Sequence, residues 1–277
     1  MLDDIILNAL REDIGVGDHS SLSCLKESDQ GIAKLLVKED GILAGVEVAK
    51  RVFELYDATL DVKLLIEDGA PIKTGDIVME VKGRAQSILS TERLVLNIMQ
   101  RMSGIATKTN QIVAKIQHTG AKVLDTRKTT PGIRALEKKA VVIGGGMNHR
   151  FGLYDMIMLK DNHIDFAGGV KRAIQKTNIY VSQMDKPVPI EIEIRNKEEL
   201  VAAIETNGIQ RILLDNFSPS ELKELVPLIP SHIESEASGG ITEESILSYA
   251  ETGVDFISMG ALTHSVKSLD LSLKAYF

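Results

Sequence analysis

Residues 188–216 read VPIEIEIRNKEELVAAIETNGIQRILLDN, and this stretch decides the fold. It begins with alternating Ile and Glu, which predicts a strand over 188–194. A helical pattern follows over 197–206 and ends at Asn207-Gly208, a frequent signal for the end of a helix. The apolar run 211–215 then predicts a second strand. A strand, a helix and a strand in this order indicate a parallel β–α–β unit.

The same alternation continues on both sides of this stretch. We expect further strands over 121–125, 156–160, 232–237 and 254–259, with helices over 133–142 and 166–176, from 218 onward and over 242–253. Every predicted strand ends in charged or small polar residues, as α/β barrels require, whereas a doubly wound sheet gathers its chemistry at one crevice. About 140 residues are available, and a closed eightfold barrel takes ~250. We therefore favour an α/β fold with an open, incomplete barrel of about six parallel strands.

The first hundred residues have a different pattern. Strands are expected over 32–37, 62–66 and 77–81, with helices over 46–55 and 90–101. This mixture predicts a smaller N-terminal α+β domain over 1–103, followed by the barrel over 104–264. The apolar segment 265–277 is expected to pack back onto the N-terminal domain.

Composition narrows the class of protein. Of 277 residues, 44% are hydrophobic and 26% are charged, which is typical of a globular protein and excludes disorder as the main state. The N-terminus has neither the basic nor the apolar region of a secretory signal. Cys24 is the single cysteine, which excludes an intramolecular disulfide and fits a reducing cytoplasm. The net charge of -7 argues against a protein that binds nucleic acid through bulk charge.

The charge is unevenly distributed along the chain. Residues 127–160 hold seven basic and two acidic residues. Lys138 and Lys139 lie in a predicted helix and are expected to form a solvated helix face. Arg127-Lys128 and His149-Arg150 lie instead beside Thr, Pro, Gly and Asn, which is typical of loops that carry binding groups. This local positive charge predicts a small anionic ligand.

Two carboxylates, Glu193 and Asp215, come at the ends of neighbouring predicted strands. They have three possible roles: general acid and base, ligands of a magnesium ion, or salt-bridge partners of Lys160 or Lys128. A transition-metal site is disfavoured, because no pair of histidines has a recognisable ligand spacing.

Two glycine-containing segments follow the last two strands. Ser238-Gly239-Gly240 comes before a helix expected to begin near Thr242, and Gly260–His264 follows the last strand. Glycines let backbone amides approach an anion, and α/β barrels often bind phosphate after their last two strands. Gly144–Gly146 does not follow a predicted strand, so a dinucleotide-binding fingerprint is rejected.

Several blocks of this chain resemble the quinolinate phosphoribosyltransferase family, also called the carboxylating nicotinate-nucleotide pyrophosphorylases. The blocks are DTRKTTPGIR at 125–134, GGGMNHRFGL at 144–153, LKDNH at 159–163, EIE at 191–193, LLDNF at 213–217, EASGG at 236–240 and GALTH at 260–264, with TER at 91–93 and SGIAT at 103–107. They extend over nearly the whole chain. The segment GVGDHSS at 15–21 departs from the shorter Gly-Asp-Thr pattern usual in the family.

The resemblance implies a pentosyltransferase of de novo NAD biosynthesis. Such an enzyme transfers the phosphoribosyl group of phosphoribosyl pyrophosphate to the ring nitrogen of quinolinate, giving nicotinate mononucleotide, pyrophosphate and CO2. The implied fold is an open α/β barrel beside a small sandwich domain, in a cytoplasmic homodimer. Whether dimers assemble further is left open.

The resemblance also implies roles for individual residues. The residues implied to bind quinolinate are Arg93, Thr126, Arg127, His149, Arg150 and Lys160, with Arg93 contributed by a second subunit. Those implied to bind phosphoribosyl pyrophosphate are Lys128, Asn216, Ser238, Gly239, Gly240, Gly260 and His264. Mg2+ is implied at Glu193 and Asp215, and the implied catalytic residues are Lys128, Lys160, Glu193 and Asp215.

Three alternatives stay open at this stage. The first is a phosphoribosyltransferase of the same fold that acts on nicotinate or another base, including the molybdenum-transport-associated relatives. A site for one carboxylate would not need this many cations, which argues against nicotinate. The second is a barrel lyase that forms a Schiff base at Lys160. The third is a non-catalytic protein that binds phosphoribosyl pyrophosphate.

Overall fold

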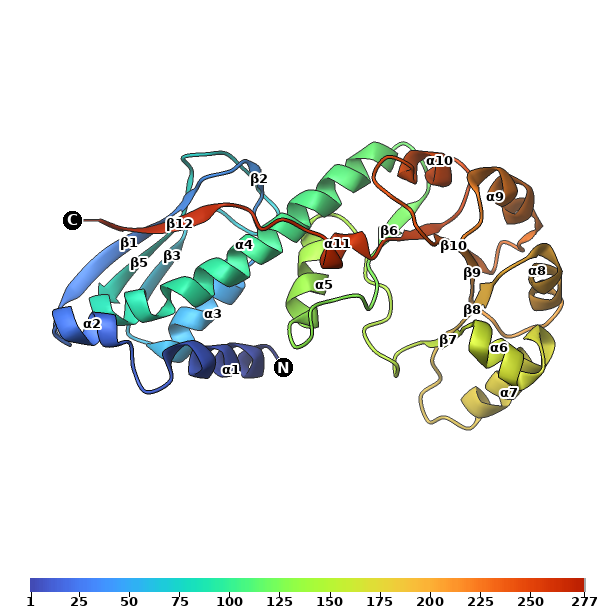
Figure 1. The fold of residues 1–277 in the computed structure, drawn as a ribbon, viewed down its shortest axis with the longest axis horizontal. Coiled ribbons are helices and arrows are strands. Elements are labelled where there is room, and N and C mark those ends of the chain that lie inside the picture. Colours follow the sequence, from blue (N-terminus) through green and yellow to red (C-terminus); the bar gives the residue numbers. More distant parts are fainter. Residues whose placement is uncertain (277) are drawn as a thin grey trace. The chain divides into compact units, whose positions relative to one another are not determined.

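The computed structural model describes residues 1–276, which form two compact units (Figure 1). Of the described residues, the first unit contains 1–110, 129–145 and 262–276, and the second contains 111–128 and 146–261. The sequence-based division at residue 103 stays a prediction. Phe277, the last residue of the segment predicted to pack back, lies outside the described residues.

The first unit is built on a four-stranded antiparallel sheet with the order β12-β1-β5-β3. Its strands are β1 (Gln30–Val37), β3 (Asp61–Leu64), β5 (Ile77–Arg84) and β12 (Leu271–Tyr276), and β2 (Gly41–Ile42) pairs separately with β4 (Pro71–Ile72). The helices of this unit include α1 (Leu2–Ile14), α2 (His19–Cys24), α3 (Val46–Tyr56) and α5 (Arg134–Ile143). Buried side chains such as Leu35, Phe53 and Val81 form its core.

The long helix α4 (Ala85–Ile116) extends well beyond the predicted range 90–101. Gly104 lies inside the helix, at a close packing position. A Cβ at Gly104 would lie 2.3 Å from the carbonyl oxygen of Lys267, so only glycine permits this approach. Beyond it, Ile105, Ile112 and Ile116 are buried and continue the apolar face of the helix.

The second unit contains a six-stranded, wholly parallel sheet with the order β6-β11-β10-β9-β8-β7. The strands are β6 (Lys122–Leu124), β7 (Ile157–Leu159), β8 (Ile190–Ile194), β9 (Arg211–Asp215), β10 (Glu234–Ser238) and β11 (Phe256–Ser258). Within the described residues β6 and β7 are edges that do not pair with one another. The sheet is therefore an incomplete α/β barrel with about the predicted strand number, and this prediction is confirmed.

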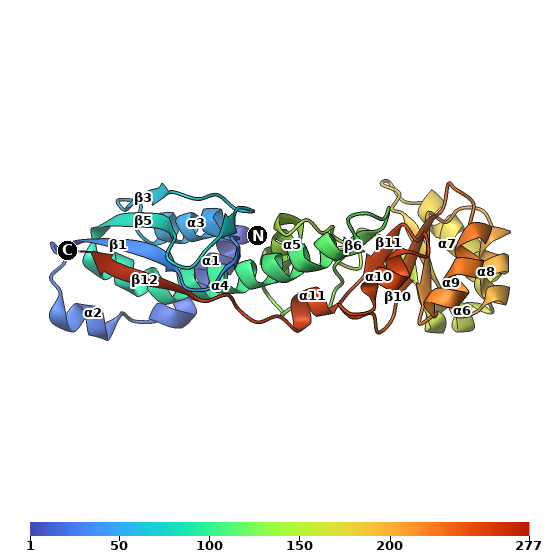
Figure 2. The ribbon, with the colours of Figure 1, turned by 90° about the horizontal axis from the view of Figure 1, so that it is seen from above.

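Helices lie on the outer side of this sheet (Figures 1 and 2). They are α6 (Asp161–Ala167), α7 (Val170–Ser182), α8 (Lys197–Ile204), α9 (Pro219–Leu225) with the short η1 (Val226–Leu228), and α10 (Ile246–Ala250). The single helix predicted over 166–176 is wrong, because Gly168 and Gly169 adopt positive φ angles of 90° and 106° and separate α6 from α7. Helix α9 begins as predicted, with Ser218 accepting a hydrogen bond from the backbone N–H of Glu221.

Strand β8 places two buried glutamates inside the second unit. Its isoleucines and glutamates alternate, yet all five residues are buried. The face that carries Glu191 and Glu193 is therefore turned away from bulk water rather than solvated. Among residues 1–276, no helix combines the length and apolar character needed to cross a membrane.

Candidate active site

Lys160, Glu193 and Asp215 lie at the carboxyl ends of three adjacent strands in the second unit, and Lys128, which follows β6, acts on the same group. Lys160, directly after β7, donates a hydrogen bond of 2.9 Å from Nζ to Glu193 on β8. The side chain of Lys160 is 49% exposed, whereas that of Glu193 is 11% exposed. At the end of β9, burial and the nearby Glu193 raise the pKa of Asp215, and Lys160 and Lys128 act in the opposite direction. The predicted salt bridge to Lys160 is thus present, on Glu193.

Two arginines place positive charge in the same unit. Burial and the neighbouring charge of Arg127 lower the pKa of Arg150. The Arg150 guanidinium donates from Nη1 to the carbonyl oxygen of Met156 at 3.2 Å. Arg127 itself is exposed and follows Thr126, whose Oγ1 accepts a hydrogen bond from the backbone N–H of Lys128 at 3.0 Å. Two guanidinium groups near one another favour an anion with more than one negative charge.

The ends of β9 and β10 are held together by Asn216 and Gly239. Asn216 adopts a positive φ of 60°, donates from Nδ2 to Asp215 at 2.5 Å, and donates from its backbone N–H to the carbonyl of Ser238 at 2.9 Å. Gly239 has a φ of +96°, and a Cβ there would lie 2.3 Å from Asn216 Oδ1. Gly239 is therefore required by close contact as well as by its backbone conformation.

The predicted phosphate segment of the second unit continues with Gly240, which has a φ of +60°. The prediction that a helix begins near Thr242 is wrong: α10 begins at Ile246 and has only five residues, because 243–245 form a turn. Within residues 1–276, no helix begins directly after Gly239 and Gly240, so a helix N-terminus does not support phosphate binding there. Gly260 follows β11, immediately before the short helix α11 (Ala261–His264).

Two of the predicted site residues belong to the first unit. Arg93 is exposed on α4 and has no hydrogen bond or ion pair within residues 1–276. His264 ends α11, and its Nδ1 lies 2.6 Å from Ser265 Oγ. Lys138, expected on a solvated helix face, is only 2% exposed, so that prediction is wrong for Lys138, whereas Lys139 is exposed as expected.

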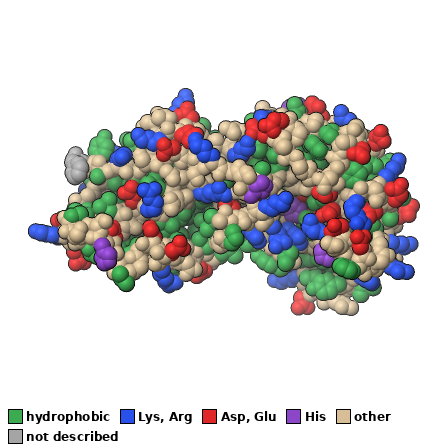
Figure 3. All heavy atoms as spheres, viewed as in Figure 1, with side chains coloured by type: hydrophobic (Ala, Val, Ile, Leu, Met, Phe, Trp, Pro, Cys, Tyr) green, Lys and Arg blue, Asp and Glu red, His purple; other side chains and the backbone are tan. Residues whose placement is uncertain are grey.

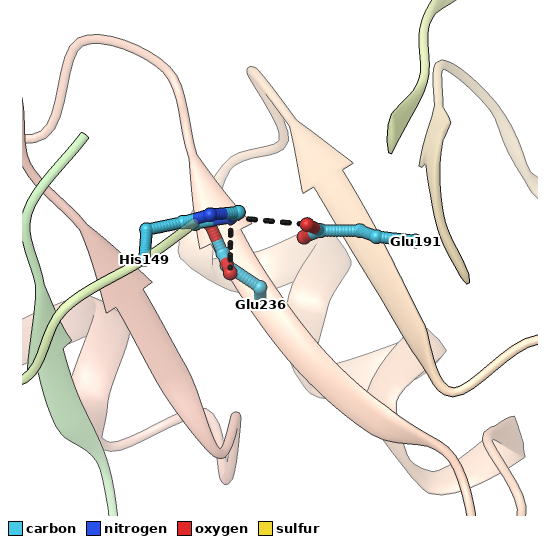
Figure 4. A group of neighbouring side chains, drawn as sticks. All are labelled: His149, Glu191 and Glu236. Atoms are coloured by element: carbon cyan, nitrogen blue, oxygen red, sulfur yellow. Dashed lines mark ion pairs between the residues drawn. The ribbon is translucent and has the colours of Figure 1, made fainter. Parts of the chain in front are cut away.

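A buried charged cluster lies inside the second unit, around His149 (Figure 4). His149 Nε2 is 3.0 Å from Glu191 Oε2 on β8 and 3.4 Å from Glu236 Oε2 on β10. Arg211, at the start of β9, donates to Glu236 from Nη1 at 3.1 Å. Burial lowers the pKa of His149, but its contacts with Glu191 and Glu236 outweigh burial and raise it to about 9.

Charges of both signs also lie side by side on the surface of the second unit that Figure 3 shows. The face is therefore not a uniformly basic surface of the kind that binds nucleic acid.

Nearly the whole chain matches one protein family. Residues 105–274 match the family described as "Quinolinate phosphoribosyl transferase, C-terminal domain", and residues 18–103 match its N-terminal domain. The chain belongs to the quinolinate phosphoribosyltransferase family. The resemblance drawn from the sequence blocks is thereby confirmed.

Individual relatives of this family agree in sequence and fold. The chain is 46% identical over 262 residues to the "Probable nicotinate-nucleotide pyrophosphorylase [carboxylating]" of Bacillus subtilis (strain 168), covering 95% of this chain and 89% of that protein. It is 43% identical over 288 residues to the "Quinolinate phosphoribosyltransferase [decarboxylating] 2, mitochondrial" of Nicotiana glauca, covering 99% and 82%. The crystal structure of NadC from Streptococcus pyogenes matches with a TM-score of 0.93 and 39% identity, covering 100% and 97%.

The quinolinate phosphoribosyltransferase fold brings together predicted residues from four separate strand ends. Lys128, Lys160, Glu193 and Asp215 form one electrostatic group. Sequence reasoning placed Glu191 and Glu236 only among polar strand ends and assigned them no role in the site. A signal was present, because Glu191 lies two residues before Glu193 and therefore on the same face of its strand.

Proposed function

We propose that this protein transfers the phosphoribosyl group of phosphoribosyl pyrophosphate to quinolinate and releases nicotinate mononucleotide, pyrophosphate and CO2. The observation that carries the proposal is the Lys160–Glu193 ion pair beside Asp215, at the ends of three adjacent strands, in a chain of this family. The relatives named above bear the names of this activity. The product places the enzyme in de novo NAD biosynthesis.

For quinolinate, the proposed ligands are the cations around Arg150. Arg127 and Arg150 would each grip a carboxylate with a planar guanidinium, and Lys160 adds a third positive charge. Thr126 and His149 complete the set within this chain. Arg93 is proposed to come from a second subunit of a homodimer, and its exposed position without a partner among residues 1–276 supports this role.

For phosphoribosyl pyrophosphate, the proposed ligands follow the other strand ends. Lys128 would contact the pyrophosphate, while Glu193 and Asp215 would face the ribose. The residues proposed to hold the 5′-phosphate region are Asn216, Ser238, Gly239, Gly240, Gly260 and His264. Glycines with positive φ support this proposal, because they leave backbone N–H groups accessible to an anion.

A magnesium ion fits the carboxylate pair. Glu193 raises the pKa of Asp215, so the two groups repel one another, and a bound cation relieves that repulsion. Carboxylate oxygens are ligands that Mg2+ prefers, usually together with substrate phosphates. When bound, the ion would neutralise the negative charge of the pyrophosphate.

Phosphoribosyl transfer needs residues that stabilise the ribose and residues that stabilise the departing pyrophosphate. The bond between C1 of the ribose and the pyrophosphate oxygen breaks, and the pyrophosphate leaves with the electron pair. Glu193 and Asp215 stabilise the positive charge that develops on the sugar, and Lys128 stabilises the departing anion. The quinolinate nitrogen donates its lone pair to C1 and becomes cationic.

Decarboxylation then follows without a further cofactor. The C–C bond to the adjacent carboxylate breaks, its electrons pass to the ring that carries the cationic nitrogen, and CO2 leaves. A proton is taken up at the carbon that held the carboxylate. The arginines hold the dicarboxylate in the orientation for nitrogen attack, which contributes by fixing the reacting atoms close together.

The test is to incubate the purified protein with quinolinate, phosphoribosyl pyrophosphate and Mg2+. We expect nicotinate mononucleotide and CO2 in equal amounts, and no turnover when EDTA removes the metal. Turnover of nicotinate in place of quinolinate would refute the substrate assignment. Binding of phosphoribosyl pyrophosphate without pyrophosphate release would support a non-catalytic protein instead.

The alternative of a Schiff-base lyase is tested by borohydride trapping with a carbonyl substrate. Lys160 is ion-paired and half exposed, whereas a Schiff-base lysine is usually desolvated in a hydrophobic pocket. We therefore expect no trapped adduct. Sedimentation of the purified protein tests the proposed homodimer, and fractionation of the cells that produce it tests the proposed cytoplasmic location.

A further inference from the structure

Four charged side chains form an alternating series inside the second unit. The order is Arg211, Glu236, His149 and Glu191, with successive N···O distances of 3.1, 3.4 and 3.0 Å. The exposed fractions of these side chains are 12% for Arg211, 4% for His149 and 0% for both glutamates. The series links β9, β10 and β8 to the segment that carries His149.

Burial makes each member of this series depend on its neighbours. A buried carboxylate needs a nearby positive charge, since isolated charges are very costly away from water. Neither oxygen of Glu191 has an aligned hydrogen bond among the described residues, so its contact with His149 is an ion pair. Glu236 is shared between His149 and Arg211. His149 is therefore the cation that joins the two carboxylates.

His149 also lies directly beside Arg150, another residue predicted to bind quinolinate, and the two share close backbone contacts. Its backbone N–H donates to Asp125 Oδ1 at 2.9 Å, and its Nδ1 lies 2.6 Å from the backbone nitrogen of Arg150. The imidazole therefore has close neighbours at both ring nitrogens, Glu191 and Glu236 at Nε2 and the backbone of Arg150 at Nδ1. Any movement of the ring would move the backbone from which the Arg150 side chain starts.

We propose that Glu191 and Glu236 are positioning residues that clamp the imidazole of His149 and thereby fix Arg150 for a substrate with two carboxylates. This inference rests on the proposed function and adds residues that act through another residue. The charged groups that face His149 are Glu191 from β8, Glu236 from β10 and Asp125 after β6, with Arg150 beside it and Arg211 reached through Glu236. The raised pKa of His149 supports the same arrangement.

The test compares Glu191→Gln and Glu236→Gln with the control Glu198→Gln, whose side chain is exposed on α8. Glutamine keeps the volume and removes the charge. We expect the KM for quinolinate to rise about tenfold or more in both buried variants, since residues that orient a ligand group contribute on the order of 10–100-fold. The KM for phosphoribosyl pyrophosphate should change less than about twofold, and the control should match the wild type.

A second measurement follows His149 directly. NMR titration of the His149 ring in the wild type should give a pKa near 9, and the pKa should fall in Glu191→Gln because one carboxylate neighbour is lost. Thermal unfolding of each variant shows whether the fold is retained. Because Glu236 also neutralises Arg211, Glu236→Gln is expected to be the less stable variant, so Glu191→Gln is the primary test.

Several results would overturn the inference. An unchanged KM for quinolinate in Glu191→Gln, or an equal rise in both KM values, would mean that the cluster supports the fold alone. The same three side chains also form a possible metal-ligand group. Stoichiometric metal in the purified wild type, lost in Glu191→Gln, would show a metal site and not a positioning clamp.

Failure of the proposed function would look different. If the wild type forms no nicotinate mononucleotide, the proposed activity is wrong, whatever the variants do. Calorimetric titration with quinolinate alone then decides the positioning role. Weaker quinolinate binding by Glu191→Gln than by Glu198→Gln would support the clamp, and equal binding would overturn it.

Discussion

Replacing Gly239 with alanine should disturb the end of β10 far more than the same replacement at Gly240. Both glycines have positive φ angles, +96° and +60°. A Cβ at Gly239 would lie 2.3 Å from Asn216 Oδ1 and 2.7 Å from the Asn216 backbone nitrogen, whereas a Cβ at Gly240 would meet nothing within 4 Å. The two variants therefore separate backbone strain from steric overlap.

The expected loss of stability is the sum of two costs, one for the backbone conformation and one for steric overlap. A left-handed conformation costs a residue with a Cβ about 1–2 kcal/mol, and this cost applies to both variants. Overpacking adds about 1–3 kcal/mol at Gly239 alone, because the backbone of Asn216 must shift. At about 3 °C for each kcal/mol, Gly239→Ala should unfold roughly 3–9 °C below Gly240→Ala.

The assay is thermal unfolding of both variants, combined with steady-state kinetics. Displacement of Asn216 also disturbs its hydrogen bond with Asp215, so the KM for phosphoribosyl pyrophosphate should rise more in Gly239→Ala than in Gly240→Ala. Equal unfolding temperatures for the two variants would refute the packing described at the ends of β9 and β10.

Three further predictions concern single substitutions. Arg150→Lys should raise the KM for quinolinate about tenfold, because lysine lacks the planar fork that grips a carboxylate, and a change of less than twofold would contradict this role. Gly104→Ala should lower the unfolding temperature although alanine favours helices, because its Cβ would overlap the carbonyl of Lys267; a stabilised variant would count against this packing. Asp57→Asn should lower the unfolding temperature at pH 7, because a hydrogen bond from Arg84 keeps the pKa of Asp57 well below its usual value. That stabilisation is present above about pH 4 and is lost as the pH falls, so the variant and the wild type should converge in acid, and a constant difference would contradict it.

The strands of the second unit were predictable because their signals are local. β9 matches its predicted range, 211–215, and the other five strands of this sheet lie within or close to theirs. Parallel order then brings the carboxyl ends of all six strands to one edge, so Lys160, Glu193 and Asp215 meet as expected. Local sequence patterns determine the strands, and the parallel topology brings the residues after them together.

The errors arise where distant residues decide the outcome. The predicted helix 90–101 is too short, because α4 continues past Gly104, where the backbone of Lys267 comes too close for any side chain. Alternation in β8 places its glutamates on one face, but the pattern alone does not show that this face is buried in a polar barrel interior. The ion pairs of His149 join positions 149, 191 and 236, which no local pattern links.

The position of β12 beside β1 has a consequence for synthesis on the ribosome. The first unit's sheet is completed by residues 271–276, although β1, β5 and β3 are made within the first hundred residues. Until those last residues emerge, one edge of β1 has unpaired backbone groups and resembles an aggregation-prone edge strand. A nascent chain therefore has an exposed strand edge along β1 until residues 271–276 have left the ribosome.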